Sequence, residues 1–354
     1  MNNNTTIGMD LGNAKHTVCA LDADGNILFR KEIANTPEAL KPFFEENAGA
    51  TVAMETGLCC RWISALAKGC GCDAIVGNAR KLAAIWASKN KNDANDALLI
   101  AKNARADREL FHPVTLRDDE HHELLQIIGL RDIAISERTK AVNAIRGMCK
   151  ARAVFLPKCD ANCFLKAATA GIPDSLMPLF RPMLALLKTA EGVVKRYDKM
   201  LERYSGIHFG EDVRILKTAP CVGPITSAAF VACVGDAGRF GKARDIGPFL
   251  GLTPGQDQSG ASDAPKRITK AGNATLRHLL VNCATRIMQA NSPDCALKRH
   301  GQRICARGGK VAKKKARVAV ARKLAVLMLA MLKSRKEYDD SMPVADKRKD
   351  GGAA

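Results

Sequence analysis

The first part of the chain alternates between short apolar runs and polar turns, a pattern typical of strands. Thr5 to Asp10 alternates and then runs apolar into Gly12, which predicts a strand that ends in a tight turn. Two more strands are expected at residues 16–21 and 27–33, because residues 22–26 between them (DADGN) supply turn chemistry. The chain should therefore open with three consecutive antiparallel strands.

Strands and helices alternate after this opening. Thr36 is placed to cap a helix that runs to about Asn47. The same periodicities predict a strand at residues 51–55, a helix at 60–67, a strand at 72–76 and a helix from Arg80 onward. Three strands followed by strand–helix alternation predict an α/β domain, a mixed sheet covered by helices.

The middle of the chain carries two long helical patterns. From Asp118 to about Val154 there is no proline, and apolar residues recur at helical spacing at Leu124, Ile127, Ile128, Ile135, Val142 and Ile145. A second helix is expected from Leu176 to about Tyr204, after a turn that contains cysteine and proline. The two helices can pair as an antiparallel coiled coil. This apolar stripe is open to two interpretations: structural packing, or a surface for a second subunit or a nucleic acid.

A third pattern begins near Ile215. A short helix, a turn that contains Gly223, and an apolar helix at residues 225–234 predict a helix-hairpin-helix-like unit, whose exposed backbone N–H groups suit a phosphate. A loop rich in Gly, Ser and Asp follows at residues 251–265, then helices at 275–290 and 311–332. The charged tail from Ser334 onward is expected to be disordered.

These patterns divide the 354 residues into four parts. We expect an α/β catalytic domain at residues 1–110, a helical coiled-coil linker at 118–205, a mostly α-helical domain at 210–335 and a disordered tail at 336–354.

The charge of the chain indicates a class of partner, because it is concentrated in one region. The formal net charge is +19, yet residues 1–106 hold 12 Lys and Arg against 11 Asp and Glu. Residues 264–334 hold 17 Lys and Arg against one acid, Asp294. A neutral front and a polybasic back favour chemistry in the first and contact with a phosphate backbone in the second.

The cysteine content and the N-terminal sequence indicate the cellular compartment of the protein. The 13 cysteines are odd in number and form no paired CxxC set, which argues against a disulfide framework or a zinc site and for thiols in a reducing cytosol. The chain shows neither a signal-peptide pattern nor an apolar run of about 18 residues. We therefore expect a cytoplasmic protein without a membrane span.

Four carboxylates occupy positions that a metal site requires. Asp10 and Glu55 each close a predicted strand, and Asp93 and Asp96 stand three apart at the start of a helix, hence on one face. Carboxylates brought together repel one another unless a cation such as Mg2+ binds them, and one or two Mg2+ ions can also hold the oxygens of a phosphodiester. Taken singly, Asp93 is equally well explained as a helix cap and Glu55 as a surface acid.

Several motifs, in order, carry a resemblance to a known family. The segments GMDLG (8–12), METG (54–57) and KNDANDA (91–97) resemble the DEDD motifs of insertion-sequence transposases with a RuvC-like, ribonuclease H-like N-terminal domain. The segments LGLTP (250–254), QSG (258–260) and ITKAGNATLR (268–277) resemble the C-terminal transposase domain of that family. The resemblance spans roughly residues 5 to 335.

The resemblance implies a transposase or recombinase that a structured guide RNA directs to donor and target double-stranded DNA. It implies that Asp10, Glu55, Asp93 and Asp96 bind Mg2+, and that Ser259 attacks the DNA phosphate to give a covalent phosphoserine intermediate. The family commonly shows Ser-Ser-Gly-Gly where this chain has Gln258-Ser259-Gly260-Ala261, so Ser262 remains a second candidate. Strand exchange between two DNA molecules requires two active sites, which predicts a homodimer or homotetramer whose subunit interface is formed by the long helices.

Basic residues supply the predicted nucleic-acid contacts. On the long helix the candidates for guide-RNA contact are Arg131, Arg138, Asn143 and Arg146. Near the serine loop the candidates for the scissile phosphate are Lys270, Asn273 and Arg277. On the last helix the candidates for the DNA backbone are Lys313, Lys314, Lys315 and Arg317, for which a solvated charge run is the alternative. Aromatic residues make up only 5%, which favours backbone and shape recognition over base stacking.

Three other functions are compatible with parts of the pattern. A RuvC-like, structure-specific endonuclease would use the carboxylates without a covalent intermediate. An actin-like kinase would use Asp10-Leu11-Gly12-Asn13 as a phosphate loop, but Asp236-Ala237-Gly238 is a poor second loop and the basic helices have no role there. An inactive RNA-binding relative would keep only the basic surfaces.

Overall fold

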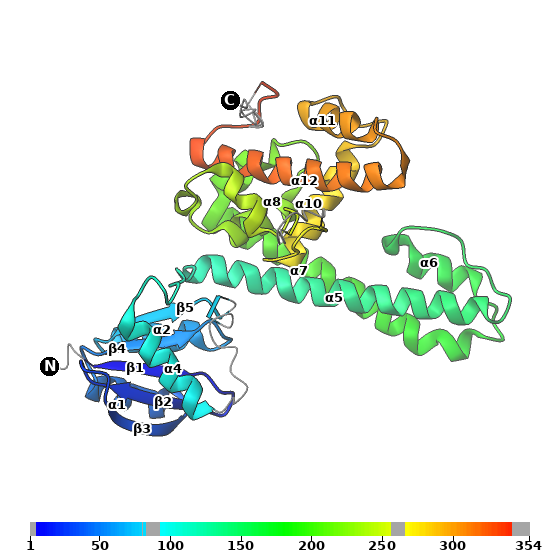
Figure 1. The fold of residues 1–354 in the computed structure, drawn as a ribbon. Helices are drawn as coiled ribbons and strands as arrows, with labels where there is room; N and C mark the ends of the chain where they lie inside the picture. The colour runs from blue at the N-terminus through cyan, green and yellow to red at the C-terminus, as the bar shows by residue number, and fades with distance from the viewer. Residues whose placement is uncertain (1–4, 80, 83–92, 256–265, 342–354) are drawn as a thin grey trace. The chain divides into compact units, whose positions relative to one another are not determined.

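The computed structural model describes residues 5–79, 81–82, 93–255 and 266–341. The chain separates into two compact units, Met1–Leu116 and Arg117–Ala354, and each is described by itself. Strands and helices of both units are labelled in Figure 1. None of the described helices is long and apolar enough to cross a lipid bilayer.

A five-stranded mixed sheet organises the first unit (Figure 1). Its strands are β1 (Thr6–Asp10), β2 (Lys15–Leu21), β3 (Ile27–Ala34), β4 (Thr51–Glu55) and β5 (Asp73–Gly77), in the spatial order β3-β2-β1-β4-β5. Strand β1 pairs antiparallel with β2 and parallel with β4, and β4 pairs parallel with β5. The mixed sheet and the three antiparallel opening strands predicted from the sequence are confirmed.

Helices cover both faces of this sheet. Helices α1 (Pro37–Glu46) and α2 (Cys60–Gly69) share a core with Ile7, Met9, Val52 and Met54, which point to one face. Helix α4 (Asp93–Ala106) packs on the other face, where its alanines meet Cys19, Leu21 and Ala53. Thr36 caps α1 through its side chain, as its position predicted.

The second unit is helical. Its helices are α5 (Asp119–Lys150), α6 (Ala161–Gly171), α7 (Met177–Lys217), α8 (Pro224–Val234), α9 (Ile246–Phe249), α10 (Ala274–Ile287), α11 (Ala296–Cys305) and α12 (Gly309–Ser334), with 3-10 turns η1 (Ala237–Arg239) and η2 (Ala243–Asp245). Helix α7 runs beyond the predicted end at Tyr204 because a single non-helical residue, Phe209, joins two helical stretches. The predicted turn before it contains α6, whose Phe164 and Ala168 pack into a small core with α5 and α7.

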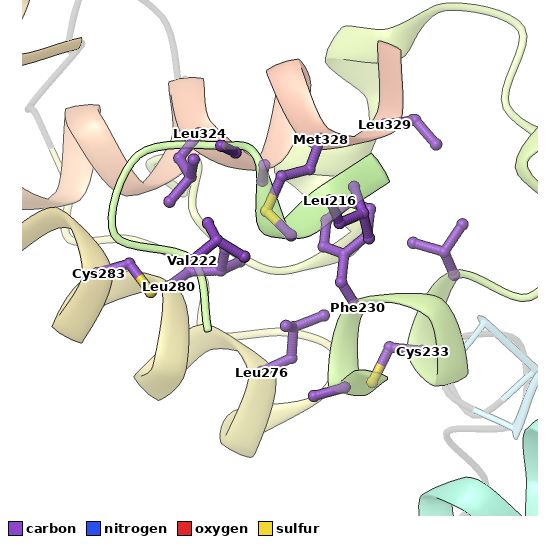
Figure 2. Packing of buried hydrophobic residues seen from close by; sticks show 14 of the residues in the cluster. Leu216, Val222, Phe230, Cys233, Leu276, Leu280, Cys283, Leu324, Met328 and Leu329 are labelled. Carbon is purple, nitrogen blue, oxygen red and sulfur yellow. The ribbon is translucent and has the colours of Figure 1, made fainter. Parts of the chain in front are cut away.

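Helix α8 lies at the centre of the main core of this unit. Every residue from Thr226 to Val234 is buried, so the helix is enclosed on all sides. Figure 2 shows Phe230 and Cys233 of this helix among side chains from the end of α7, α10 and α12. Burial raises the pKa of Cys233 to about 12, so its thiol stays protonated. All 13 cysteines are free thiols, as their spacing predicted.

Helices α5 and α7 lie alongside one another and run in opposite directions (Figure 1). Tyr204 Oη donates to Glu123 at 3.0 Å, and Arg131 Nε donates to Asp198 at 2.5 Å. The residue numbers of the contacting side chains increase along α5 while they decrease along α7, so the two helices are antiparallel. That these helices supercoil remains a prediction.

The start of the predicted disordered tail is ordered in the structure. Glu337 pairs with Arg214, and the backbone N–H of Tyr338 donates to Thr218 Oγ1 at 2.8 Å. Asp340 accepts from Arg299 at 2.6 Å. Charged composition favoured disorder, but these partners, which lie 41 to 123 residues away in the chain, hold the segment on the helical unit.

Candidate active site and nucleic-acid interface

Two of the predicted metal ligands end neighbouring parallel strands. Met9 of β1 is the partner of Met54 of β4, so Asp10 and Glu55 follow at the same level of the sheet. Both carboxylates are half-buried. Because carboxyl ends of parallel strands meet at one edge, the two acids share that edge even though 45 residues separate them in the chain.

Helix α4, which begins at Asp93, starts toward the same edge. Its middle lies on Gly8, where an added Cβ would stand 2.1 Å from the carbonyl oxygen of Ala97. Its last turn lies at the other end of the sheet, since Arg105 donates to the carbonyl of Ala23 at 2.8 Å in the turn after β2. The helix therefore runs antiparallel to β1, and its first turn lies toward Asp10.

Gly8 and Arg105 help to position α4, and their sequence pattern does not indicate this role. In the sequence Gly8 is only part of a motif, whereas in the structure it allows the backbones of helix and strand to approach closely. Arg105 gave no local signal, because its partner is a backbone carbonyl 82 residues away. Together they set the position and direction of the helix that carries Asp93 and Asp96.

The structure describes the side chains of three of the four predicted metal-binding acids. Asp96 is half-buried on α4, whereas the side chain of Asp93 lies outside the described residues. Within the described part, no three His, Cys, Asp or Glu side chains are grouped closely enough to hold a metal ion. The donor type nevertheless fits Mg2+, since carboxylate oxygens are the hard ligands that this ion prefers. Mg2+ binding by Asp10, Glu55, Asp93 and Asp96 therefore stays a prediction.

The predicted serine loop has a well-defined base. Residues 250–255 and 266–272 flank it, and Pro254 and Ile268 form an antiparallel bridge. Backbone N–H groups of Gly255 and Thr269 donate across the base at 3.0 and 2.9 Å. Ser259 and Ser262 lie outside the described residues, so the choice between them remains a prediction.

Glycines allow the two sides of this base to touch. Gly251 and Gly272 have φ of +64° and +73°. A Cβ on Gly251 would lie 2.2 Å from the backbone nitrogen of Ala271, and one on Gly272 would lie 2.1 Å from the carbonyl oxygen of Phe249. Only glycine combines this conformation with this approach.

The three residues predicted to contact the scissile phosphate lie at this base and differ in burial and hydrogen bonding. Arg277 is half-buried and donates to the carbonyls of Leu250 and Ala271 at 3.0 and 2.8 Å, so its guanidinium joins both sides of the base. Asn273 caps α10 by accepting from the Leu276 N–H at 2.9 Å. Lys270 is exposed, with a left-handed φ of +56°. Of the three, Lys270 is the residue whose charged group has the most access to a ligand.

The predicted RNA-contacting residues of α5 are mostly engaged within the helical unit. Arg131 is 11% exposed in its ion pair with Asp198. Arg138 donates to Asn162 at 3.1 Å, and Arg146 donates to the carbonyl of Leu156 at 3.3 Å and stacks over a phenylalanine ring. Asn143 is exposed. The structure gives the three arginines packing contacts, and their contact with RNA stays a prediction.

The basic end of α12 is open to solvent. Its apolar side is buried at Ala312, Ala316 and Val320, whereas the charged residues between them are exposed. These exposed residues are Lys313, Lys314, Lys315 and Arg317. A helix buried on one side and cationic on the other is suited to follow a phosphate backbone.

A turn joins α7 to α8 at the position of the predicted hairpin, but the first helix is the end of the 41-residue α7 rather than a separate short helix. Thr218 to Gly223 form the turn, and Gly223 is the residue before α8, with no side chain to cap the helix. Pro224 takes the first helical position, where its missing N–H costs no hydrogen bond. That the free N–H groups at this helix start bind a phosphate stays a prediction.

Comparison with known proteins identifies the family of the chain. A family model described as "Transposase" matches residues 7–151, and another described as "Transposase IS116/IS110/IS902 family" matches residues 213–313. The chain is similar to a transposase for insertion sequence element IS1328 of Yersinia enterocolitica, with 28% identity over 82% of this chain and 85% of the relative.

Two more relatives cover most of the chain. A transposase for insertion sequence element IS1111A of Coxiella burnetii is 25% identical over 80% of this chain and 78% of its own length. An uncharacterized 43.6 kDa protein of insertion element IS110 from Streptomyces coelicolor is 24% identical over 95% of this chain and 96% of its own length. With both family models in order along it, this chain belongs to the IS116/IS110/IS902 family of insertion-sequence transposases.

Proposed function

We propose that this protein cleaves and exchanges DNA strands at the ends of an insertion sequence, directed by a structured guide RNA, with a Mg2+ site in a ribonuclease H-like unit and a serine nucleophile. The observation that carries the proposal is the shared sheet edge. Asp10 and Glu55 end adjacent parallel strands there, and the helix that begins at Asp93 runs toward it. Strand order and direction are compatible with a ribonuclease H-like fold.

The acidic edge has a defined part in this reaction. Asp10, Glu55, Asp93 and Asp96 would hold Mg2+, which when bound stabilises negative charge on a phosphodiester. The protein's contribution is to hold carboxylates on rigid strand ends and a helix start, so that little reorganisation accompanies the reaction.

The serine supplies the covalent step. Ser259 Oγ gives up its proton and attacks the DNA phosphorus. A P–O bond to the serine forms as the P–O bond to one deoxyribose oxygen breaks, and that oxygen takes up a proton to leave as a hydroxyl. A phosphoserine link conserves the phosphodiester for rejoining to another strand. Glycine-dependent contacts at residues 250–255 and 266–272 support this role, because they hold the base of the loop in one conformation. Ser262 is the alternative nucleophile.

Exposed cations support DNA binding, and the net charge of +19 supports a polyanionic partner. Lys270 beside the serine loop and the basic end of α12 are exposed to solvent. For the guide RNA, Asn143 is the exposed candidate on α5. A homodimer or homotetramer would supply the two active sites that strand exchange requires.

A single substitution series separates this mechanism from a RuvC-like endonuclease. Purified protein with its element DNA and co-purified RNA is incubated with Mg2+, and protein–DNA adducts are trapped by denaturation. The wild type should form an adduct, Ser259→Ala should form none and should not cleave, and Ser262→Ala should retain both activities. Full cleavage by Ser259→Ala without any adduct in the wild type would support the endonuclease instead.

The guide RNA is tested separately. The protein is co-expressed with the non-coding DNA that flanks its element, and bound RNA is sequenced after purification. One discrete RNA from the element is the expected result, and the absence of any enriched RNA would contradict the RNA-guided part of the proposal while leaving the carboxylate site intact.

A further inference from the structure

A buried imidazole lies near the acidic edge of the sheet. His16, the second residue of β2, is 0% exposed, and its Nε2 lies 3.0 Å from Asn35 Oδ1. Its Nδ1 is buried and has no hydrogen-bond partner among the described residues. A buried polar atom left unsatisfied costs free energy, so a compensating role for this histidine is expected.

The partners of Asn35 define how these side chains are oriented. Asn35 Nδ2 donates to the carbonyl oxygen of Asn13 at 2.9 Å. A carbonyl only accepts, so the amide oxygen of Asn35 faces His16, and His16 must donate from Nε2. Burial lowers the pKa of His16, against the opposite effect of the Asn35 hydrogen bond, which agrees with a neutral ring.

This amide touches both loops that follow the acid-bearing strands. Asn13 and Ala14 belong to the loop after Asp10, and Asn35 binds it twice, since its backbone N–H also donates to the carbonyl of Ala14 at 3.0 Å. Asn35 Nδ2 further lies 3.4 Å from the sulfur of Cys59, in the turn after Glu55.

The loop after Asp10 is also tightly packed against its own backbone. A Cβ on Gly12 would stand 2.1 Å from the carbonyl oxygen of Lys15, so the loop is tightly folded. It also reaches the turn after Glu55, because a Cβ on Gly57 would lie 3.8 Å from Leu11 Cδ1. The side chain of Asn35 is thus a bridge between two loops that already touch.

We propose that Asn35, held in one orientation by the buried His16, is a positioning residue that sets the spacing of the strand ends bearing Asp10 and Glu55. This inference rests on the proposed metal-binding function of those acids. Neither residue is among the four acids proposed to bind Mg2+. Groups that orient the ligands of a metal affect affinity strongly, and their loss commonly costs about 10- to 100-fold in metal affinity or activity.

The test measures Mg2+ binding by the full-length protein without DNA. Isothermal titration with MgCl2 is performed on the wild type, Asp10→Ala, Asn35→Ala and Asn47→Ala, and thermal unfolding is recorded for each. Asn47 is the matched control, because its Nδ2 also donates to a backbone carbonyl, that of Phe43 at 2.7 Å, before the opposite end of β4. We expect Asn35→Ala to raise the Mg2+ Kd by about 10-fold or more, and Asn47→Ala to leave it unchanged at a similar loss of thermal stability.

Different outcomes distinguish this inference from the proposed function. If the wild type binds Mg2+ and Asp10→Ala does not, while Asn35→Ala binds as tightly as Asn47→Ala, the positioning role is refuted and the metal site stands. If the wild type and Asp10→Ala bind Mg2+ equally weakly, both the site and the inference are refuted.

A second pair of variants covers the case in which Asn35→Ala does not fold. His16→Leu removes the donor to Asn35, whereas His16→Gln retains an N–H that can donate. Weaker Mg2+ binding by His16→Leu, with recovery in His16→Gln, supports the inference. Equal Mg2+ affinity of these two variants and the wild type overturns it.

Discussion

Substitution of Gly8 by alanine tests the geometry that brings α4 toward the acidic edge. An added Cβ would lie 2.1 Å from the carbonyl oxygen of Ala97, 2.4 Å from the backbone nitrogen of Ala101 and 2.9 Å from its Cα. All three are backbone atoms, so no side chain can turn away. Ordinary contact begins at 3.4 Å, hence α4 must move from β1 by about 1 Å or more.

Both stability and activity should respond to this shift. Overpacking of a core by one methyl group costs about 1 to 3 kcal/mol. A displacement of about 1 Å in a catalytic group can lower the rate about 100-fold, and the residues displaced here are Asp93 and Asp96. We therefore expect Gly8→Ala to lower the unfolding temperature by several degrees and to lower Mg2+-dependent DNA cleavage by about two orders of magnitude.

The assay pairs Gly8→Ala with Gly69→Ala. Gly69 ends α2, and a Cβ there would meet no atom within 4 Å, so this control should keep or slightly raise the stability of the wild type. Thermal unfolding and the initial cleavage rate are measured for both variants. Wild-type stability and cleavage by Gly8→Ala would refute the close approach of α4 to β1.

Three further predictions concern the helical unit. Arg131→Leu leaves Asp198 without its ion-pair partner between α5 and α7, and because the Asp198 side chain is 38% exposed, stability should fall by about 1 kcal/mol. A double-mutant cycle with Asp198→Leu, measured by chemical denaturation, should reveal the coupling. The four exposed cations of α12 are Lys313, Lys314, Lys315 and Arg317. Their replacement by alanine should make the dependence of log K for DNA on log salt concentration shallower, by about 3 to 4 in slope. An unchanged slope would show that DNA binds elsewhere. Contacts with the Ala296 N–H, Tyr338 and Arg299 lower the pKa of Asp340 from 3.8 to about 2, so the stability it contributes is complete above about pH 4 and is lost as the pH falls through about 2; Asp340→Ala should remove this acid dependence and should speed proteolysis of the C-terminal segment at neutral pH.

Local periodicity was sufficient for the five strands and for helices α1 and α2 of the first unit, whereas the helix predicted from Arg80 lies largely outside the described residues. Alternation at residues 5–10 and 51–55, with turn residues at 22–26, predicted strands that the structure contains. Such signals depend on neighbours in the chain, so they can be read without knowledge of the fold. Where a signal was weak, as in the short helix α6, the prediction was a turn, because packing on α5 and α7 stabilises that helix more than its own pattern indicates.

The order of the chemistry-bearing motifs was also available from the sequence, and it identified the family that the comparisons support. It did not distinguish an arginine that binds a ligand from one that holds the fold. Arg277 and Arg131 were both predicted to contact nucleic acid, yet one joins two backbone segments and the other forms a shielded ion pair.

The sequence by itself determined the five strands of the first unit and most of the helices, the two acids that end β1 and β4, and the region where the positive charge is concentrated. Only the tertiary structure decided that α4 runs toward Asp10, that Arg277 spans the base of the serine loop and that Asn35 joins two loops. The physical reason is that these contacts involve backbone carbonyls and sulfur, groups that many residues offer equally. Which of them becomes a partner depends on long-range packing rather than on local spacing.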